Sequence, residues 1–165
     1  MVKMDDDSAA NAFDAFYAAE FGRLAGALRL ACGGDGRVGE ELAQEAMVRA
    51  WTHWKHVRTM ERPAGWLYMT GFNLVRRRWR DSRRSAPEVG HRDQVEVAES
   101  RLDLDSALSR LPLQQRKAVI ARHVLGFSTE EAAELLAISP DALRAVLHRG
   151  VTALRRSPAL AATED

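Results

Sequence analysis

The stretch from residue 62 to residue 84, RPAGWLYMTGFNLVRRRWRDSRR, carries the side chains best suited to binding chemistry. On a helical wheel it separates into an apolar side and a polar side. The polar side carries Trp66, Thr70, Asn73, Arg76, Arg77 and Arg80. Guanidinium groups bind phosphates, an amide hydrogen-bonds to a base edge, and an aromatic ring stacks on a base. The pattern therefore predicts a helix that binds a nucleic-acid strand. The alternative is a basic face that is only solvated and binds nothing.

A second basic helix is expected near the end of the sequence. Ser128 and Glu131 form a capping box that opens a short apolar helix. After a tight turn, Ser139 caps a longer helix whose first residue is Pro140. The outer face of that longer helix carries Arg144, His148 and Arg149. This order is the helix-turn-helix arrangement, in which arginine reaches guanine edges in the major groove. A helical hairpin with solvated arginines is the alternative.

Other helices must hold these two in place. Apolar residues at helical spacing predict them at residues 9–31, 38–54, 101–109 and 113–124. Residues 85–100 carry many charges, a proline and a glycine, and they show no hydrophobic periodicity. This composition indicates a flexible linker, with a short strand at 94–97 as an alternative for part of it. The sequence thus predicts an all-α fold of two small helical domains, residues 1–84 and 101–157, with a loose start at 1–8 and a tail at 158–165.

Charge is segregated along the chain although the formal net charge is only +1. Acidic residues gather at 5–7, 40–45 and 130–134, and basic residues at 76–84 and 144–156. Separate basic stripes suit a protein that touches DNA at chosen places and another protein elsewhere. In the helix at 38–54 we expect one arc to be buried: Ala43, Ala46, Met47, Ala50, Trp51 and Trp54.

The composition also argues against several classes of function. No apolar run is long enough to cross a bilayer, and the acidic start of the chain lacks the apolar core of a secretory signal. The single cysteine, Cys32, excludes an internal disulfide and suits the reducing cytoplasm. His53 and His56 lack a third metal ligand, and Gly33-Gly34 lacks the lysine of a phosphate-binding loop. We therefore expect no metal, no cofactor, no catalytic residue and no membrane insertion.

Three motifs in this order resemble the bacterial extracytoplasmic-function sigma factors of RNA polymerase, of the kind found in actinobacteria. EELAQEAMVRAW is similar to the segment that binds core polymerase, and RPAGWLYMTGFNLVRRRWR to the segment that melts and reads the minus-ten element. LPLQQRKAVIARHVLGFSTEEAAELLAISPDALRAVLHRGVTALRR is similar to the region that reads the minus-thirty-five element. The resemblance extends from Phe13 to Arg156.

The resemblance implies roles for particular residues. The residues matching the clamp-binding helix, which docks on the largest polymerase subunit, are Glu41, Leu42, Gln44 and Glu45. Asn73 matches the position that reads a flipped-out minus-ten base, with Trp66 and Thr70 beside it on the polar face. Arg76, Arg77 and Arg80 match the basic run that holds phosphates. The residues matching contacts to the minus-thirty-five element are Arg144, His148 and Arg149.

The implied partners are RNA polymerase core, through the clamp and the flap of the second-largest subunit, and promoter DNA. An anti-sigma factor is a further partner that the resemblance allows, and the implied location is the cytoplasm. Asp141, Ala145 and Val146 depart from the family pattern, which suggests an unusual minus-thirty-five preference. A stand-alone helix-turn-helix regulator and an enzyme acting on nucleic acid are the alternatives; the regulator would bind duplex DNA without polymerase, and the enzyme would need a catalytic set that the sequence lacks.

Overall fold

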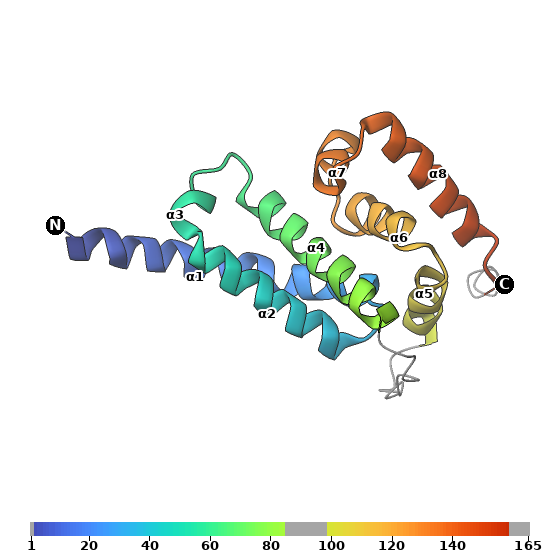
Figure 1. Cartoon of the computed structure of the whole chain (residues 1–165), viewed down its shortest axis with the longest axis horizontal. Coiled ribbons are helices and arrows are strands. Elements are labelled where there is room, and N and C mark those ends of the chain that lie inside the picture. Colours follow the sequence, from blue (N-terminus) through green and yellow to red (C-terminus); the bar gives the residue numbers. More distant parts are fainter. Residues whose placement is uncertain (1, 85–98, 159–165) are drawn as a thin grey trace.

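Every regular element in the described part of the chain, residues 2–84 and 99–158, is helical in the computed structural model (Figure 1). The first half contains α1 (Val2–Ala31), α2 (Gly36–Thr52), α3 (Trp54–Val57) and α4 (Pro63–Arg84). The second half contains α5 (Glu99–Ser109), α6 (Leu113–Val119), a π-helical turn η1 (Ile120–Val124), α7 (Thr129–Leu136) and α8 (Pro140–Arg155). The predicted all-α fold is confirmed.

The first half is a bundle in which α4 packs against both α1 and α2. Its core is built from Leu24, Leu28, Met47, Leu67, Phe72 and Val75. The approach of α2 to α1 is very close at Gly39, where an added Cβ would lie 2.7 Å from the backbone nitrogen of Arg29. The Asp35 carboxylate begins α2 by accepting a hydrogen bond of 3.1 Å from the Val38 nitrogen.

The second half places α7 and α8 as a helix-turn-helix, with α6 behind α8. The predicted capping box is present: the Glu131 nitrogen donates to Ser128 Oγ, and the Ser128 nitrogen donates to the Glu131 carboxylate. Ala137 ends α7 in the left-handed region, with φ of 54°, which makes the turn to α8 tight. Ser139 Oγ then caps α8 by accepting from the Ala142 nitrogen at 3.1 Å.

Helix boundaries differ from the expectations in three places. The expected loose start is wrong from residue 2 onward, because α1 begins at Val2. The second helix stops at Thr52 and is followed by the separate short helix α3. The helix expected at 113–124 changes to π-helical geometry at Ile120. Most of the expected linker, the strand expected at 94–97 and most of the tail lie outside the described residues.

The two halves share one hydrophobic core. In Figure 1, α6 and α7 lie beside α4, and α5 lies near the end of α4. None of the described helices is long and apolar enough to cross a membrane. This packing of one half on the other is a feature that the sequence did not predict, and it determines which parts of the candidate site are exposed.

Candidate nucleic-acid interface

The outer face of α4 presents four of the predicted nucleic-acid-binding residues to solvent: Asn73, Arg76, Arg77 and Arg80. The opposite face is anchored in the core by Leu67, Phe72 and Val75. Tyr68, also on the inner face, donates from its hydroxyl to the Glu20 carboxylate on α1 at 3.0 Å. Burial raises the pKa of Tyr68, and the neighbouring Glu20 charge raises that pKa further. The helix is therefore held firmly from behind while its amide and guanidiniums remain accessible.

The other two residues predicted for this face, Trp66 and Thr70, lie elsewhere. Thr70 is only 9% exposed, and its hydroxyl donates to the Trp66 carbonyl oxygen at 2.9 Å. Trp66 is half-buried, with its ring centroid 6.1 Å from that of His53. In the helical-wheel prediction both residues face solvent, but α7 packs over the first turns of α4. In this conformation Thr70 is not available to a nucleic acid, and Trp66 is only partly available.

Trp66 lines a cavity of about 420 Å³ between the two halves. The first half contributes Met60 and Met69 to its apolar wall, and the second half contributes Phe127 and Leu135. The charged residues that also line it are Glu61, Arg62, Glu131 and Glu134. An aromatic side chain with apolar neighbours at the start of a nucleic-acid-binding helix suits a base that has left its stack. Here that aromatic residue is covered by α7.

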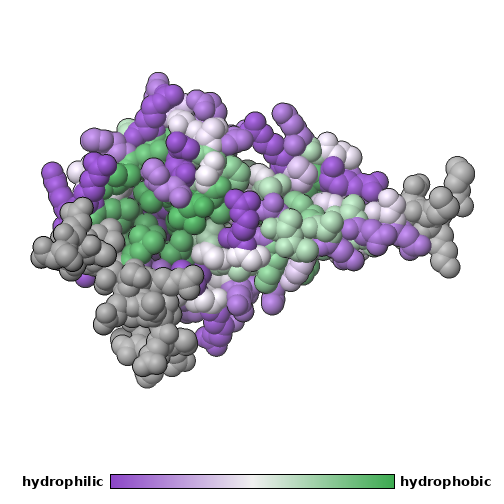
Figure 2. All heavy atoms as spheres, turned by 180° about the vertical axis from the view of Figure 1, so that it is seen from behind, coloured by the Kyte–Doolittle hydropathy of each residue, from purple (hydrophilic) through white to green (hydrophobic). Residues whose placement is uncertain are grey.

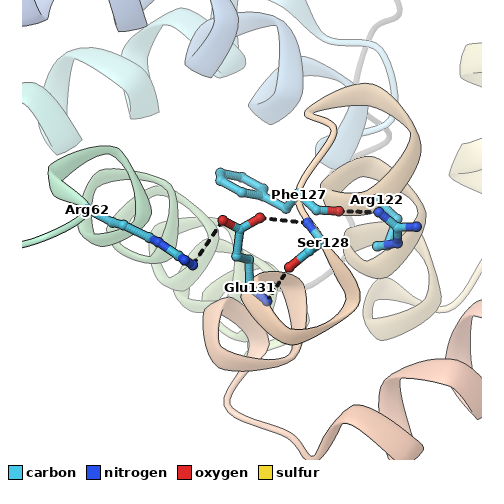
Figure 3. Close-up of polar contacts among 5 residues, drawn as sticks. All are labelled: Arg62, Arg122, Phe127, Ser128 and Glu131. Atoms are coloured by element: carbon cyan, nitrogen blue, oxygen red, sulfur yellow. Dashed lines mark hydrogen bonds and ion pairs between the residues drawn. The ribbon is translucent and has the colours of Figure 1, made fainter.

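The polar contacts around Glu131 close one side of this region (Figure 3). Arg62, in the loop before α4, reaches across to the Glu131 carboxylate at 2.9 Å. The same carboxylate accepts from the Ser128 backbone nitrogen at 2.6 Å, and Arg122 donates to the carbonyl oxygen of Phe127. The hydrogen bond from Ser128 and the Arg62 charge lower the pKa of Glu131, so the carboxylate is ionised in this pair.

The residues predicted to bind a protein partner lie on α2. Glu41, Gln44 and Glu45 are exposed, and Glu45 pairs with Arg49 at 2.7 Å. Leu42 is only 6% exposed and belongs to the core, so it supports the helix from behind and does not present its side chain to a partner in this conformation.

An apolar groove beside these residues was missed by the sequence reasoning. Trp51, expected in the core, is 50% exposed, and Val48 and Tyr17 are exposed to 64% and 39%. Together with Gln44 and neighbouring side chains they line a shallow groove between α1 and α2 of about 540 Å³. The sequence does contain a signal for this groove, because the apolar arc on α2 is wider than α1 and α4 together can cover. Exposed aromatic and aliphatic groups next to carboxylates are typical of a protein-binding surface.

The third group of predicted residues, Arg144, His148 and Arg149, is exposed on α8. The inner face of this helix packs against α6, where a Cβ added at Gly150 would lie 3.1 Å from Val119 Cγ2. The Arg144 guanidinium is held at the start of the helix by Asp141 at 2.6 Å and by Glu130 of α7 at 3.9 Å. These exposed pairs stabilise the fold little, but they leave the guanidinium pointing away from the core.

The departures from the family pattern fall on two kinds of position. Val146 is buried at 9% exposure, so a side chain there packs within the domain. Asp141 and Ala145 are exposed and lie on the outer face of α8. The expected change in minus-thirty-five preference therefore rests on Asp141 and Ala145 more than on Val146.

Outside the α2 groove, other apolar side chains also remain at the surface. Leu104 of α5 and Val124 of η1 are exposed to 38% and 48%. Figure 2, which views the molecule from behind, shows apolar residues gathered over the second half. In the part of the chain with assigned positions, no group of three or more His, Cys, Asp or Glu side chains is arranged to hold a metal ion.

Comparison with known families gives two matches along the chain. Residues 21–85 match the family model described as Sigma-70 region 2. Residues 101–154 match the model described as Sigma-70, region 4. The first match ends at the end of α4, and the second covers α5 to α8.

Two curated relatives come from actinobacteria. The ECF RNA polymerase sigma factor SigL of Mycobacterium tuberculosis is 33% identical over 144 residues, covering 78% of this chain and 78% of the relative. The ECF RNA polymerase sigma factor SigE of Mycolicibacterium smegmatis is 34% identical over 131 residues, covering 70% of this chain and 50% of the relative.

Two solved structures have a similar fold. One is the sigma factor RpoE in complex with the anti-sigma factor NepR from Bartonella quintana, with a TM-score of 0.70, 18% identity, and coverage of 93% of this chain and 98% of that one. The other is CnrH in complex with the cytosolic domain of CnrY, with a TM-score of 0.70, 23% identity, and coverage of 94% and 91%. At these identities the likeness establishes the fold alone.

Proposed function

The chain belongs to the extracytoplasmic-function sigma factors, which direct RNA polymerase to specific promoters, and we propose that its two halves divide promoter recognition between them. In this proposal residues 1–84 bind core polymerase and read the minus-ten element, and residues 101–157 read the minus-thirty-five element. Residues 85–100 link the two, and 158–165 form a tail. The observation that carries the proposal is that α4 and α8 each expose a row of arginines while their other faces are fixed in the core.

On α4, we assign Asn73 to a base of the separated minus-ten strand. Its amide offers both a donor and an acceptor, which is what reading a Watson–Crick edge requires. Arg76, Arg77 and Arg80 follow on the same exposed face and would neutralise neighbouring phosphates. A strand separated from its duplex presents its base edges and its phosphates at once, which supports a role of this face in promoter melting.

On α8, Arg144, His148 and Arg149 would enter the major groove of the minus-thirty-five element, with Arg144 contacting guanine. Because Asp141 already pairs with Arg144 at 2.6 Å, this carboxylate must be displaced or must share the guanidinium with the base. We further propose that the second half docks on the flap of the second-largest polymerase subunit.

The α2 groove provides a docking surface for the polymerase clamp. Trp51 and Val48 would be its apolar anchors, and Gln44 and Glu45 its polar rim. Trp51→Ala and Glu45→Arg should each weaken affinity for purified core polymerase by at least about tenfold, as expected for anchor residues. Arg37→Ala, on an exposed position at the other end of α2, is the matched control. Unchanged affinity in Trp51→Ala and Glu45→Arg would contradict the docking role.

The remaining roles follow from the family. We expect the chain to act in the cytoplasm, where core polymerase and promoter DNA are found, and to catalyse no reaction itself. Because a sigma factor of this fold, RpoE of Bartonella quintana, was solved in complex with the anti-sigma factor NepR, we also propose that an anti-sigma factor binds this chain. Co-purification of an inhibitor with the tagged chain from its host would test this, and recovery of the chain with polymerase alone would contradict it.

A further inference from the structure

The first turn of α8 carries a carboxylate on the face that would meet DNA. Asp141 is the second residue of the helix, directly after Pro140, and its side chain is 94% exposed. An acid in the first turn stabilises a helix through the macrodipole. On a helix that enters a groove of DNA, however, the same charge repels the phosphates on both sides. The position therefore calls for a reason beyond helix stability.

Asp141 is joined to the neighbouring arginine. Its Oδ1 accepts a hydrogen bond of 2.6 Å from Nη1 of Arg144. Residues three apart lie on the same face of a helix, so both charged groups point outward together. Nη2 of Arg144 lies 3.9 Å from the carboxylate of Glu130 on α7, which is too far for a hydrogen bond. Asp141 thus fixes the guanidinium by contact, whereas Glu130 adds only charge.

The hydrogen bond between the two side chains leaves part of each free to bind. Arginine has five N–H donors, and the contact uses a donor on Nη1 alone, so other donors of the fork remain for O6 and N7 of a guanine. Among the hydrogen bonds of the described residues, Oδ2 of Asp141 receives none. The pair therefore presents donors and an acceptor side by side.

The chemistry of a carboxylate selects one base. An ionised carboxylate only accepts hydrogen bonds, so it requires an amino group in the major groove. Guanine and thymine present O6 and O4 there, and these acceptors repel it. Adenine presents its N6 amino group next to the acceptor N7, which also repels a carboxylate. Cytosine presents the N4 amino group without such a neighbour, and it is the base that an aspartate fits.

The geometry of the pair limits where that cytosine lies. The outer face of α8 is open, because the helix packs on α6 and α7 with its other face (Figure 1). Bonded atoms of Asp141 and Arg144 are 2.6 Å apart, which is less than the rise of about 3.4 Å from one base pair to the next. Because Arg144 fills the edge of its own guanine, the carboxylate beside it lies over the adjacent base pair.

We propose that Asp141 is a specificity-determining residue that accepts a hydrogen bond from N4 of a cytosine, in the base pair next to the guanine bound by Arg144. The inference rests on the proposed function of α8 as the reader of the minus-thirty-five element, and it adds a second base to that reading. The carboxylate stays on the guanidinium when DNA binds and is not displaced. Its repulsion of phosphates lowers affinity for all DNA, so that the sequence with the cytosine stands out.

Selection from a duplex library with a randomised segment tests this contact. The full chain would select duplexes once as holoenzyme with core polymerase and once alone, and the bound DNA would be sequenced. The unaltered chain should enrich a cytosine beside a guanine, each by at least about fivefold over the other bases. In Asp141→Asn the amide has the same shape but both donates and accepts, which fits N6 and N7 of adenine. The cytosine should therefore change to adenine, while the guanine is kept.

Two further variants identify the two positions. Arg144→Ala should remove the preference for the guanine and thereby show which base it reads. Glu130→Gln is the matched control, because Glu130 is likewise the second residue of its helix and its charge lies near the same guanidinium. It should change binding by the same factor on every sequence and leave the cytosine preference in place.

The outcomes separate this contact from other roles of the carboxylate. Cytosine retained in Asp141→Asn would overturn the inference, because the carboxylate would not touch the base. Loss of the guanine preference together with the cytosine would also overturn it, because Asp141 would then only orient Arg144. Failure of both selections to enrich the cytosine has the same meaning. If the chain alone selects the cytosine, and adenine in Asp141→Asn, but the holoenzyme opens none of the selected duplexes, Asp141 reads DNA and the proposed function fails.

Discussion

The close approach of α1 and α2 predicts that Gly39→Ala destabilises the first half, although alanine is the better helix former. A Cβ at this position would lie 2.7 Å from the Arg29 nitrogen, 2.8 Å from Arg29 Cα and 2.9 Å from the Ala25 carbonyl oxygen. All three are backbone atoms, which cannot rotate away as a side chain can. Restoring an ordinary contact of 3.4 Å requires α1 and α2 to move apart by about 0.7 Å.

Two opposing terms set the magnitude. Replacing glycine by alanine inside a helix gains about 1 kcal/mol. Forcing an extra carbon into a well-packed contact costs about 1–3 kcal/mol, and more where the backbone has to shift. Because all three close contacts are to backbone atoms, the cost lies at the upper end of this range, and subtracting the gain leaves Gly39→Ala less stable by about 2 kcal/mol, which for a chain of this size lowers Tm by about 4–8 °C.

Thermal unfolding followed by circular dichroism measures this effect. Gly22→Ala is the matched control, because nothing lies within 4 Å of its added Cβ on α1, and it should raise Tm by a few degrees. Because α2 carries the groove at Val48 and Trp51, the shift in Gly39→Ala should also weaken binding to core polymerase. A Gly39→Ala variant that melts at or above the temperature of the unaltered chain would refute the proposed packing of α1 on α2.

Three further substitutions test the site and its scaffold. Asn73→Ala should impair promoter opening, measured by permanganate footprinting, more than it weakens core binding; normal opening would remove Asn73 from base reading. Arg144→Ala should cost about 1–3 kcal/mol of binding to the minus-thirty-five element and relax specificity at one base pair. An equal loss on every sequence would instead make Arg144 a phosphate contact. Ser139→Ala removes the cap of α8 and should lower the free energy of unfolding by about 1 kcal/mol in urea titration, and no change would show that the cap is redundant.

Local features of the fold were predictable where one short-range interaction decides the outcome. The capping box at Ser128 and Glu131, and the Ser139-Pro140 start of α8, follow from backbone donors that need a side-chain acceptor. The exposed positions of Asn73 and Arg144 follow from helical periodicity, because the opposite face of each helix is apolar. These placements depend on few residues, all close together in sequence.

Features that depend on which helices meet were not predictable. Thr70 and Trp66 lie on the polar side of the helical wheel, yet Thr70 is buried and Trp66 faces α7 across the cavity. Trp51 lies on the apolar side, yet it remains half exposed although its ring centroid lies 4.9 Å from that of Phe13 on α1. The Arg116 contact to Ala31 joins residues 85 apart in the chain, and no local pattern encodes such a pair.

The central claim is that this chain makes RNA polymerase open promoters, and one reconstitution tests it most directly. Purified chain, core polymerase and duplex DNA carrying a promoter found by run-off transcription would be combined, and unpaired thymines detected with permanganate. The account predicts reactive thymines at the minus-ten element only when the chain and core polymerase are both present. Protection of the duplex by the chain alone, without opening when polymerase is added, would contradict it and indicate a stand-alone DNA-binding regulator.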